Sequence, residues 1–143
     1  MVIWRISEHA DLLGEGGIYA SGRWHQKGHP IVYCSDHPST ALLEILVHVD
    51  LKTIPETYQL LKIGCPDNIS FEDKLTPLSA VDFLTTQAFG TDFLRENRAC
   101  LLKVRSAIMP EAFNILINPK HPDALKIKID QQWRFPFDSR LFR

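Results

Sequence analysis

The chain contains 143 residues, with 16 lysines and arginines against 17 aspartates and glutamates, so its formal net charge is −1. A charge near zero argues against a strongly basic nucleic-acid-binding protein, and a hydrophobic content of 45% argues against a disordered one. The longest apolar stretch, Ala41–Val49, is too short to cross a membrane and contains Glu44 and His48. The first ten residues contain no signal-peptide apolar region, so we expect a cytoplasmic protein.

The predicted strands are short and rich in β-branched and aromatic residues. In chain order they cover Val2–Ile6, Pro30–Cys34, Tyr58–Cys65, Ala99–Val104 and Phe113–Ile117, with a closing pair over Ile127–Asp130 and Trp133–Phe137. Two other segments are expected to be irregular because of their glycines and turn residues, namely Leu13–Gly22 and Asp67–Pro77.

Two helices are predicted between these strands. The first follows the possible capping residues Ser35, Asp36 and Ser39 and ends near His48. The second covers Thr86–Glu96, although its glycine weakens the helical pattern. Because strands and helices do not alternate regularly, this order predicts a single α+β domain over residues 1–143, built on a small mixed sheet.

The cysteine and histidine spacings do not favour a disulfide or a metal site. Cys34, Cys65 and Cys100 are far apart and form no C-x-x-C pair, so we expect small buried hydrophobic residues. His25 and His29 are four residues apart, but glycine and proline beside the second argue against a helical ligand pair. No metal is therefore expected.

The segment Ala41–Val49 is apolar on every face except at Glu44 and His48, so we expect a helix that is buried on all sides. The two polar residues are one helical turn apart and share a face. Burial of a carboxylate is costly unless the group is paired or hydrogen-bonded. Two interpretations remain open: a structural ion pair of Glu44 with His48 or an arginine, and a catalytic carboxylate at the base of a cleft.

Three further polar residues have both a functional and a structural interpretation. Arg23 follows a glycine-rich stretch and could grip a phosphate, or it could simply lie on a surface turn. Ser106 lacks a nucleophile elbow but suits a hydrogen-bonding role at a strand end. Asn118 precedes a proline, a pair that most often forms a turn.

Taken together, short motifs along the whole chain resemble the RES domain family. They are Trp4-Arg5-Ile6, Gly22-Arg23-Trp24, Ile31-Val32-Tyr33, Ala41-Leu42-Leu43-Glu44, Val104-Arg105-Ser106 and the stretch from Asn114 to Pro122. The arginine, glutamate and serine that give the family its name match Arg23, Glu44 and Ser106. Two positions depart from the family pattern, because Arg105 stands where a proline is usual and Phe93 where a tryptophan is common.

The resemblance implies a toxin of a bacterial type II toxin–antitoxin pair that depletes cellular NAD, with a fold similar to that of ADP-ribosylating toxins. It implies an Xre-type helix-turn-helix antitoxin as partner, and we also expect a homodimer without direct nucleic-acid or membrane contact. By resemblance, Arg23, Tyr33 and Glu44 are the main active-site residues, and Ser106 and Asn118 support substrate binding.

The implied chemistry suits this set of residues. Ordinary glycosidases use two carboxyl groups because a poor leaving oxygen must be protonated. Nicotinamide leaves NAD as a neutral molecule, so one carboxylate, Glu44, can suffice by stabilising the oxocarbenium-like transition state. Arg23 would grip the pyrophosphate, Tyr33 would stack on nicotinamide or hydrogen-bond near it, and Ser106 would orient Glu44 or the ribose. NAD is then the substrate, and no cofactor is required.

Other functions remain open at this point. The same site could pass the ADP-ribosyl group to phosphate or to a protein side chain instead of water, as a phosphorylase or a transferase. A different class of function is a non-catalytic binding module or an RNase, although the charge of −1 does not favour the basic groove that an RNase uses.

Overall fold

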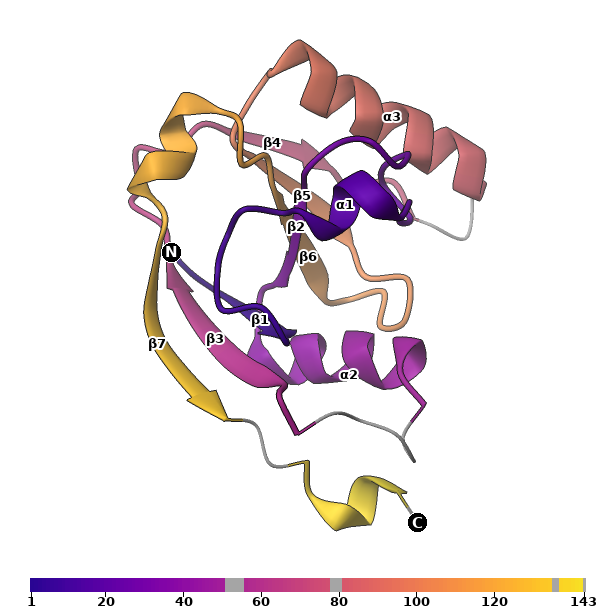
Figure 1. The fold of residues 1–143 in the computed structure, drawn as a ribbon. Helices are drawn as coiled ribbons and strands as arrows, with labels where there is room; N and C mark the ends of the chain where they lie inside the picture. The colour runs from indigo at the N-terminus through magenta and orange to yellow at the C-terminus, as the bar shows by residue number, and fades with distance from the viewer. Residues whose placement is uncertain (51–55, 78–80, 135–136, 143) are drawn as a thin grey trace.

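The computed structural model describes residues 1–50, 56–77, 81–134 and 137–142 (Figure 1). Its strands are β1 (Val2–Ser7), β2 (Val32–Ser35), β3 (Gln59–Gly64), β4 (Phe71–Lys74), β5 (Leu101–Arg105), β6 (Phe113–Ile117) and β7 (Lys128–Arg134). Its helices are α1 (Gly16–Tyr19), α2 (Pro38–His48) and α3 (Phe83–Glu96), with 3₁₀ turns η2 (Pro122–Lys126) and η3 (Ser139–Phe142). Among the described residues, no helix combines the length and apolar character that a membrane span requires.

The strands form one seven-stranded sheet in the order β4-β5-β6-β2-β1-β3-β7. β4 and β5 are parallel, and the other neighbours are antiparallel. In Figure 1, α3 lies at the top of the view and α2 near the bottom, with strands between them. This arrangement confirms the predicted α+β class and its small mixed sheet.

Three local predictions were wrong, each because a tertiary contact decides the structure. The first irregular segment contains α1, where Gly17 packs against the His29 carbonyl. The second contains β4, which exists through its parallel pairing with β5. The predicted closing pair is one continuous strand, β7, which pairs along β3 with a register shift between Lys62 and Ile63. Residues 135 and 136 of that predicted pair lie outside the described residues.

Helix α2 ends where predicted, but its cap and its burial differ from expectation. The cap is His37, whose Nδ1 accepts a hydrogen bond from the Ser39 backbone N–H at 3.1 Å. Within α2 only Thr40 and Ala41 are buried, and Val47 is 58% exposed. The helix therefore covers β1 and β2 with one face and leaves another face open.

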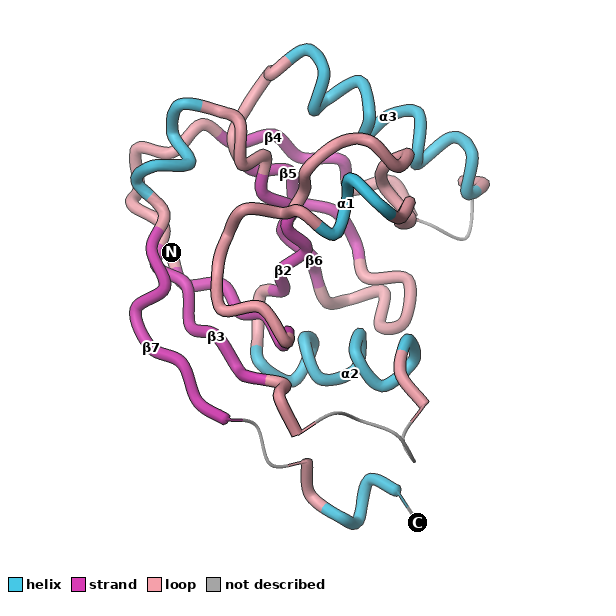
Figure 2. Tube along the Cα trace, viewed as in Figure 1, coloured by secondary structure: helices cyan, strands magenta, loops and turns pink. Residues whose placement is uncertain are grey.

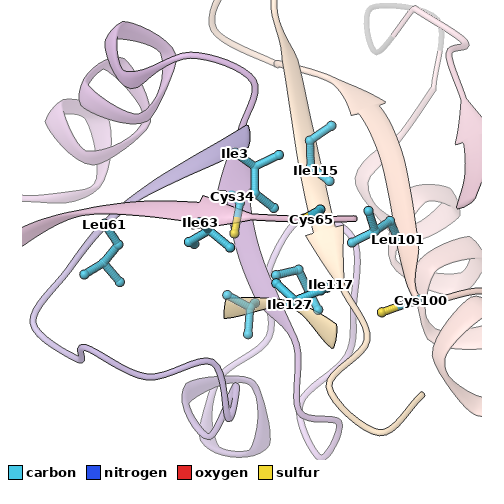
Figure 3. Packing of buried hydrophobic residues seen from close by; sticks show 11 residues of the cluster. Ile3, Cys34, Leu61, Ile63, Cys65, Cys100, Leu101, Ile115, Ile117 and Ile127 are labelled. Carbon is cyan, nitrogen blue, oxygen red and sulfur yellow. The ribbon is translucent and has the colours of Figure 1, made fainter. Parts of the chain in front are cut away.

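Strands β2, β5 and β6 are buried on both faces, which explains their nearly continuous apolar sequences. One face contributes to a cluster that includes Ile3, Cys34, Leu101 and Ile117 (Figure 3). The opposite face packs against α3 and the loop before β2 through Trp24, Ile31, Phe93, Leu94, Ala99, Leu102, Val104 and Leu116.

The three cysteines are free and buried, as predicted. Burial raises the pKa of the Cys34 thiol to about 12, and the pKa values of the Cys65 and Cys100 thiols also rise, mainly through desolvation. Thiols with such pKa values stay protonated near neutral pH and behave as small apolar side chains.

A small cluster of hydrogen bonds holds Ser70, the residue that precedes β4. The Ser70 backbone N–H donates to Asp123 Oδ2 at 2.8 Å, and the Ser70 hydroxyl accepts from the Cys100 N–H at 2.9 Å. The hydrogen bond from Ser70 is the main reason why the pKa of Asp123 falls to about 2. This carboxylate thus links η2 to the start of β4.

We predict that Asp123→Asn lowers the melting temperature at neutral pH. A carboxylate with a depressed folded-state pKa stabilises the fold above its unfolded pKa of about 3.9, and the contribution disappears as the pH falls towards the folded value. Thermal melts between pH 7 and pH 2 should show a gap between wild type and Asp123→Asn that closes below about pH 4.

The exposed carboxylate of Asp73 on β4 provides the control. Asp73→Asn should follow the wild-type melting curve across the range. A constant difference between wild type and Asp123→Asn at all pH values would contradict this role for the Asp123 charge.

Candidate functional site

A pocket of about 500 Å³ lies where the sheet divides between β1 and β2. Between these two strands, both fully described, pairing is limited to Trp4 opposite Ser35. Both strands, α2, the segment 21–24, the start of α3 and the loop after β5 all contribute to the walls. Much of the chain that joins β1 to β2 is loop, as Figure 2 shows. The volume falls in the range of small-molecule sites.

Glu44 projects from α2 into this pocket, and one of its oxygens is firmly held. Oε1 accepts hydrogen bonds from the Ser106 hydroxyl and from Asn114 Nδ2, both at 2.9 Å. Within the described residues, Oε2 makes no hydrogen bond and Glu44 forms no ion pair. The described structure therefore does not contain the ion pair of Glu44 with His48 or an arginine that the first interpretation expected. It contains an oriented carboxylate with one oxygen available to a ligand, as the second interpretation requires.

The donors to Glu44 are themselves fixed. The Ser35 hydroxyl donates to Asn114 Oδ1 at 3.0 Å, which turns the amide nitrogen of Asn114 towards Glu44. The buried Ser106 hydroxyl donates to Glu44 and accepts from the backbone N–H groups of Ile108 and Met109, each at 3.1 Å. Ser106 is thus placed to orient the carboxylate.

Arg105, the departure from the family pattern, supports the same loop. Its guanidinium donates to the carbonyl of Leu75 at 3.0 Å and to that of Pro110 at 2.9 Å. The side chain thereby braces the turn that carries Ser106. The substitution leaves the contact between Ser106 and Glu44 intact.

Arg23 lines the same pocket, where its guanidinium group is available to a ligand. Its guanidinium carbon lies 5.5 Å from the centre of the Phe83 ring. In the part of the chain that the structure describes, Arg23 forms no ion pair. A guanidinium in that state can bind a phosphate bidentately.

Helix α3 holds the backbone on both sides of Arg23. The Thr86 hydroxyl donates to the Arg23 carbonyl at 2.6 Å, and Gln87 Nε2 donates to the Gly22 carbonyl at 2.9 Å. Gly90 lets the helix approach until a side chain there would collide with the Trp24 carbonyl. Gly90 weakened the helix prediction, but the close contact between α3 and Trp24 requires a glycine at this position.

We predict that Gly90→Ala destabilises the protein by about 1–3 kcal/mol, the usual cost of overpacking. In an exposed helix the same change would stabilise by about 1 kcal/mol, so the sign of the effect tests the contact with Trp24. Chemical denaturation of both proteins measures this difference.

Gly16→Ala is the matched control, because a Cβ at that position has no neighbour within 4 Å. Its free energy of unfolding should stay level or rise by up to about 1 kcal/mol, because no contact opposes the gain in helix propensity. A more stable Gly90→Ala protein would refute the proposed role of the close approach.

Tyr33 lies in the same pocket, with its hydroxyl turned towards the protein. The hydroxyl is 2.7 Å from His25 Nδ1 and accepts from the Trp24 backbone N–H at 3.2 Å. Burial raises the pKa of Tyr33 well above its ordinary value, so the phenol stays neutral.

The ionisable residues around the pocket favour an anionic ligand. Glu44 is the one acidic residue among the described residues of the lining, beside Arg5, Arg23, Arg105 and His48. Because Arg105 is engaged with backbone carbonyls, Arg5 and Arg23 are the arginines best placed to meet a negative charge. The described residues contain no cluster of three or more His, Cys, Asp or Glu side chains that could hold a metal ion.

Asn118 does not join the other candidates. It lies beside a separate, smaller pocket, where Nδ2 donates to Asn97 Oδ1 at 2.8 Å and Oδ1 accepts from the Lys120 N–H at 3.1 Å. Asn97 is the C-cap of α3 and has a left-handed backbone conformation. Asn118 therefore ties the end of this helix to the end of β6, a structural position that its sequence did not distinguish from a ligand-binding one.

Two residues of the site were missed by sequence reasoning. Asn114 is a polar residue in an otherwise apolar strand, a signal that could have identified it. Arg5 is a charged residue between half-buried Trp4 and buried Ile6 in β1, and in the sequence such a residue is equally typical of a solvent-facing position.

Comparisons with known proteins match this chain over nearly its whole length. The RES domain family matches residues 2–138. A Toxin Res of Pseudomonas putida (strain KT2440) is 46% identical, covering 99% of this chain and 100% of that protein. A Prs ADP-ribosylating toxin of Sphingobium sp. (strain YBL2) is 32% identical, covering 98% and 96% respectively.

A chain in the crystal structure of the M. tuberculosis MbcT–MbcA toxin–antitoxin complex is similar in fold, with a TM-score of 0.74. The alignment covers 94% of this chain and 83% of that one. The sequences are 20% identical, so this likeness concerns the fold alone.

Proposed function

The chain belongs to the RES domain family, and on that premise we propose that it is a toxin that consumes NAD by cleaving the bond between nicotinamide and ribose. The observation that carries the proposal is the carboxylate of Glu44, anchored through one oxygen and available through the other, in a pocket shared with Arg23.

The reaction needs little proton transfer. The C–N bond breaks with its electron pair going to the nicotinamide ring, whose positive charge is thereby cancelled, and the ribose becomes an oxocarbenium-like cation. Glu44 stabilises that cation electrostatically, and its free oxygen can accept a hydrogen bond from a ribose hydroxyl. Water then adds to the ribose carbon and loses a proton to solvent, which yields ADP-ribose.

The remaining groups bind and orient the dinucleotide. Arg23 is proposed to grip the pyrophosphate, with Arg5 as a second positive charge in the same pocket. Tyr33 supplies an aromatic surface, and Ser106 keeps the Glu44 carboxylate in one orientation. Asn118 has no part in this proposal because its side chain is engaged elsewhere.

ADP-ribosyl transfer to a protein is the second candidate, favoured by the relative named an ADP-ribosylating toxin. Transfer to phosphate would use the same NAD-binding residues. Free ADP-ribose, ADP-ribose 1-phosphate and a mass increase on a protein are the respective products, so chromatography and mass spectrometry of one reaction distinguish them.

The primary experiment incubates the purified chain with NAD and follows nicotinamide release. We expect release that EDTA does not abolish, because a neutral leaving group needs no metal activation. Intact NAD with degraded RNA would establish the nuclease alternative, and binding of NAD without cleavage would establish a binding module.

Glu44→Gln tests the carboxylate within the same assay. Gln keeps the shape and hydrogen-bonding capacity but removes the charge, so we expect turnover to fall by about 100-fold or more with little change in melting temperature. Asp73→Asn, which changes an exposed carboxylate on β4, should retain wild-type turnover. A variant that melts lower but retains most of its activity would instead assign Glu44 a structural role.

We further propose an Xre-type antitoxin as partner, a cytoplasmic location and a homodimer. The toxin–antitoxin complex that contains a similar fold supports an antitoxin partner. An antitoxin carboxylate could occupy the place of a phosphate on Arg23, since both form bidentate pairs with arginine.

Expression in a bacterial host tests the toxin assignment. The wild-type chain should arrest growth with falling cellular NAD, Glu44→Gln should not, and co-expression of the antitoxin should restore growth. A wild-type chain that is folded, abundant and harmless without an antitoxin would contradict the toxin function.

A further inference from the structure

We infer that His25 is a positioning residue that holds the Tyr33 hydroxyl inside the protein, so that Tyr33 meets the substrate with its ring and donates no proton to it. This inference rests on the proposed function and adds to it a residue outside the family triad. It begins from the hydrogen bonds around His25, whose side chain is buried.

The contacts of His25 determine which ring nitrogen carries the proton. Nε2 is 3.0 Å from the Ala20 carbonyl and 3.2 Å from the Gly17 carbonyl, and carbonyl oxygens accept only. Nε2 must therefore be the N–H nitrogen. Burial lowers the pKa of His25, so near neutral pH the ring is neutral and Nδ1 is an acceptor.

The Tyr33 hydroxyl then has one arrangement that satisfies all its neighbours. It donates its single proton to His25 Nδ1 at 2.7 Å and accepts the Trp24 N–H at 3.2 Å. Gly22 packs so closely that a Cβ there would lie 2.5 Å from the hydroxyl oxygen. The hydroxyl has no proton left for a ligand, and the ring remains the part that the pocket can use.

His25 joins this tyrosine to the glycine-rich segment through its opposite edge. Gly17 belongs to α1, and Ala20 is the residue that ends that helix. One side chain therefore fixes both the loop that leads to Arg23 and the orientation of Tyr33. The two functions use different nitrogens, so they can be separated by substitution.

Substitution of His25 by asparagine or by glutamine separates the roles of its two ring nitrogens. His25→Asn keeps an acceptor near the position of Nδ1 but does not reach the loop carbonyls. His25→Gln keeps a donor near the position of Nε2 but loses the acceptor for Tyr33. Both should lower the melting temperature, and their kinetics should differ.

Steady-state kinetics with NAD is the first test, performed well below the melting temperature of every variant. We expect His25→Gln to raise KM about 3- to 10-fold, with kcat within about twofold of wild type. His25→Asn should have a KM close to that of wild type. The rise in KM reflects weaker stacking of a base on an aromatic ring.

Tyr33 variants complete the test. Tyr33→Phe should resemble His25→Gln, and the double variant should be no worse than either single one, because both changes remove the same hydrogen bond. Tyr33→Ala removes the ring and should raise KM by about 30-fold or more. An equal rise in KM for Tyr33→Phe and Tyr33→Ala would overturn the inference. Equal KM values for His25→Asn and His25→Gln would do the same.

A substrate-free measurement separates this inference from the proposed function. The ¹⁵N resonances of His25 at pH 7 should show the neutral ring protonated at Nε2. A proton on Nδ1 would refute the hydrogen-bond arrangement whatever the activity. Absence of NAD turnover in the wild type, with the Nε2–H form present, would refute the function and the positioning role while leaving the hydrogen bond established.

Discussion

The separation of β1 from β2 is the constraint on which the site depends. The two strands pair at Trp4 and Ser35 and then diverge, so that one sheet carries a cleft at its middle instead of a continuous surface. Sheets twist, and a pair of strands that shares little of its length can separate without breaking the ladders on either side. The ladders of β1 with β3 and of β2 with β6 run along the strands and join both walls of the cleft to the rest of the sheet.

Into this cleft the fold places the half-buried carboxylate of Glu44, which has no cationic partner among the described residues. The desolvation of Glu44 is offset by two hydrogen bonds to one oxygen, and bonds to charged groups contribute about 1.5–3 kcal/mol each. An ion pair with an arginine would stabilise the charge equally well but would neutralise the field that a developing cation needs. The arrangement keeps Glu44 and Arg23 unpaired with each other in the described structure, so both charges remain available to a ligand.

Several features of the sequence were sufficient because they reflect strong local rules. The apolar β-branched runs predicted the buried strands β2 and β6, and the apolar segment with Glu44 predicted α2 and its end near His48. The grouping of Arg23, Tyr33, Glu44 and Ser106 came from the resemblance to the RES domain family and not from a local rule. The same rules failed for β4 and α1, whose existence depends on pairing and packing with distant residues.

By itself, the sequence determined the fold class, the burial of the cysteines and two of the charged residues that line the pocket, Arg23 and Glu44. Tertiary structure alone decided which partners the candidate site residues contact. It gave Glu44 two hydrogen-bond donors, one on the turn after β5 and one on β6, 62 and 70 residues along the chain. It also bonded Asn118 to Asn97 at the end of α3 and Tyr33 to His25. Periodicity and propensity report which face of an element a residue occupies. Hydrogen bonds between side chains depend on how faces of separate elements meet, and that information appears only when the sheet and its helices are assembled.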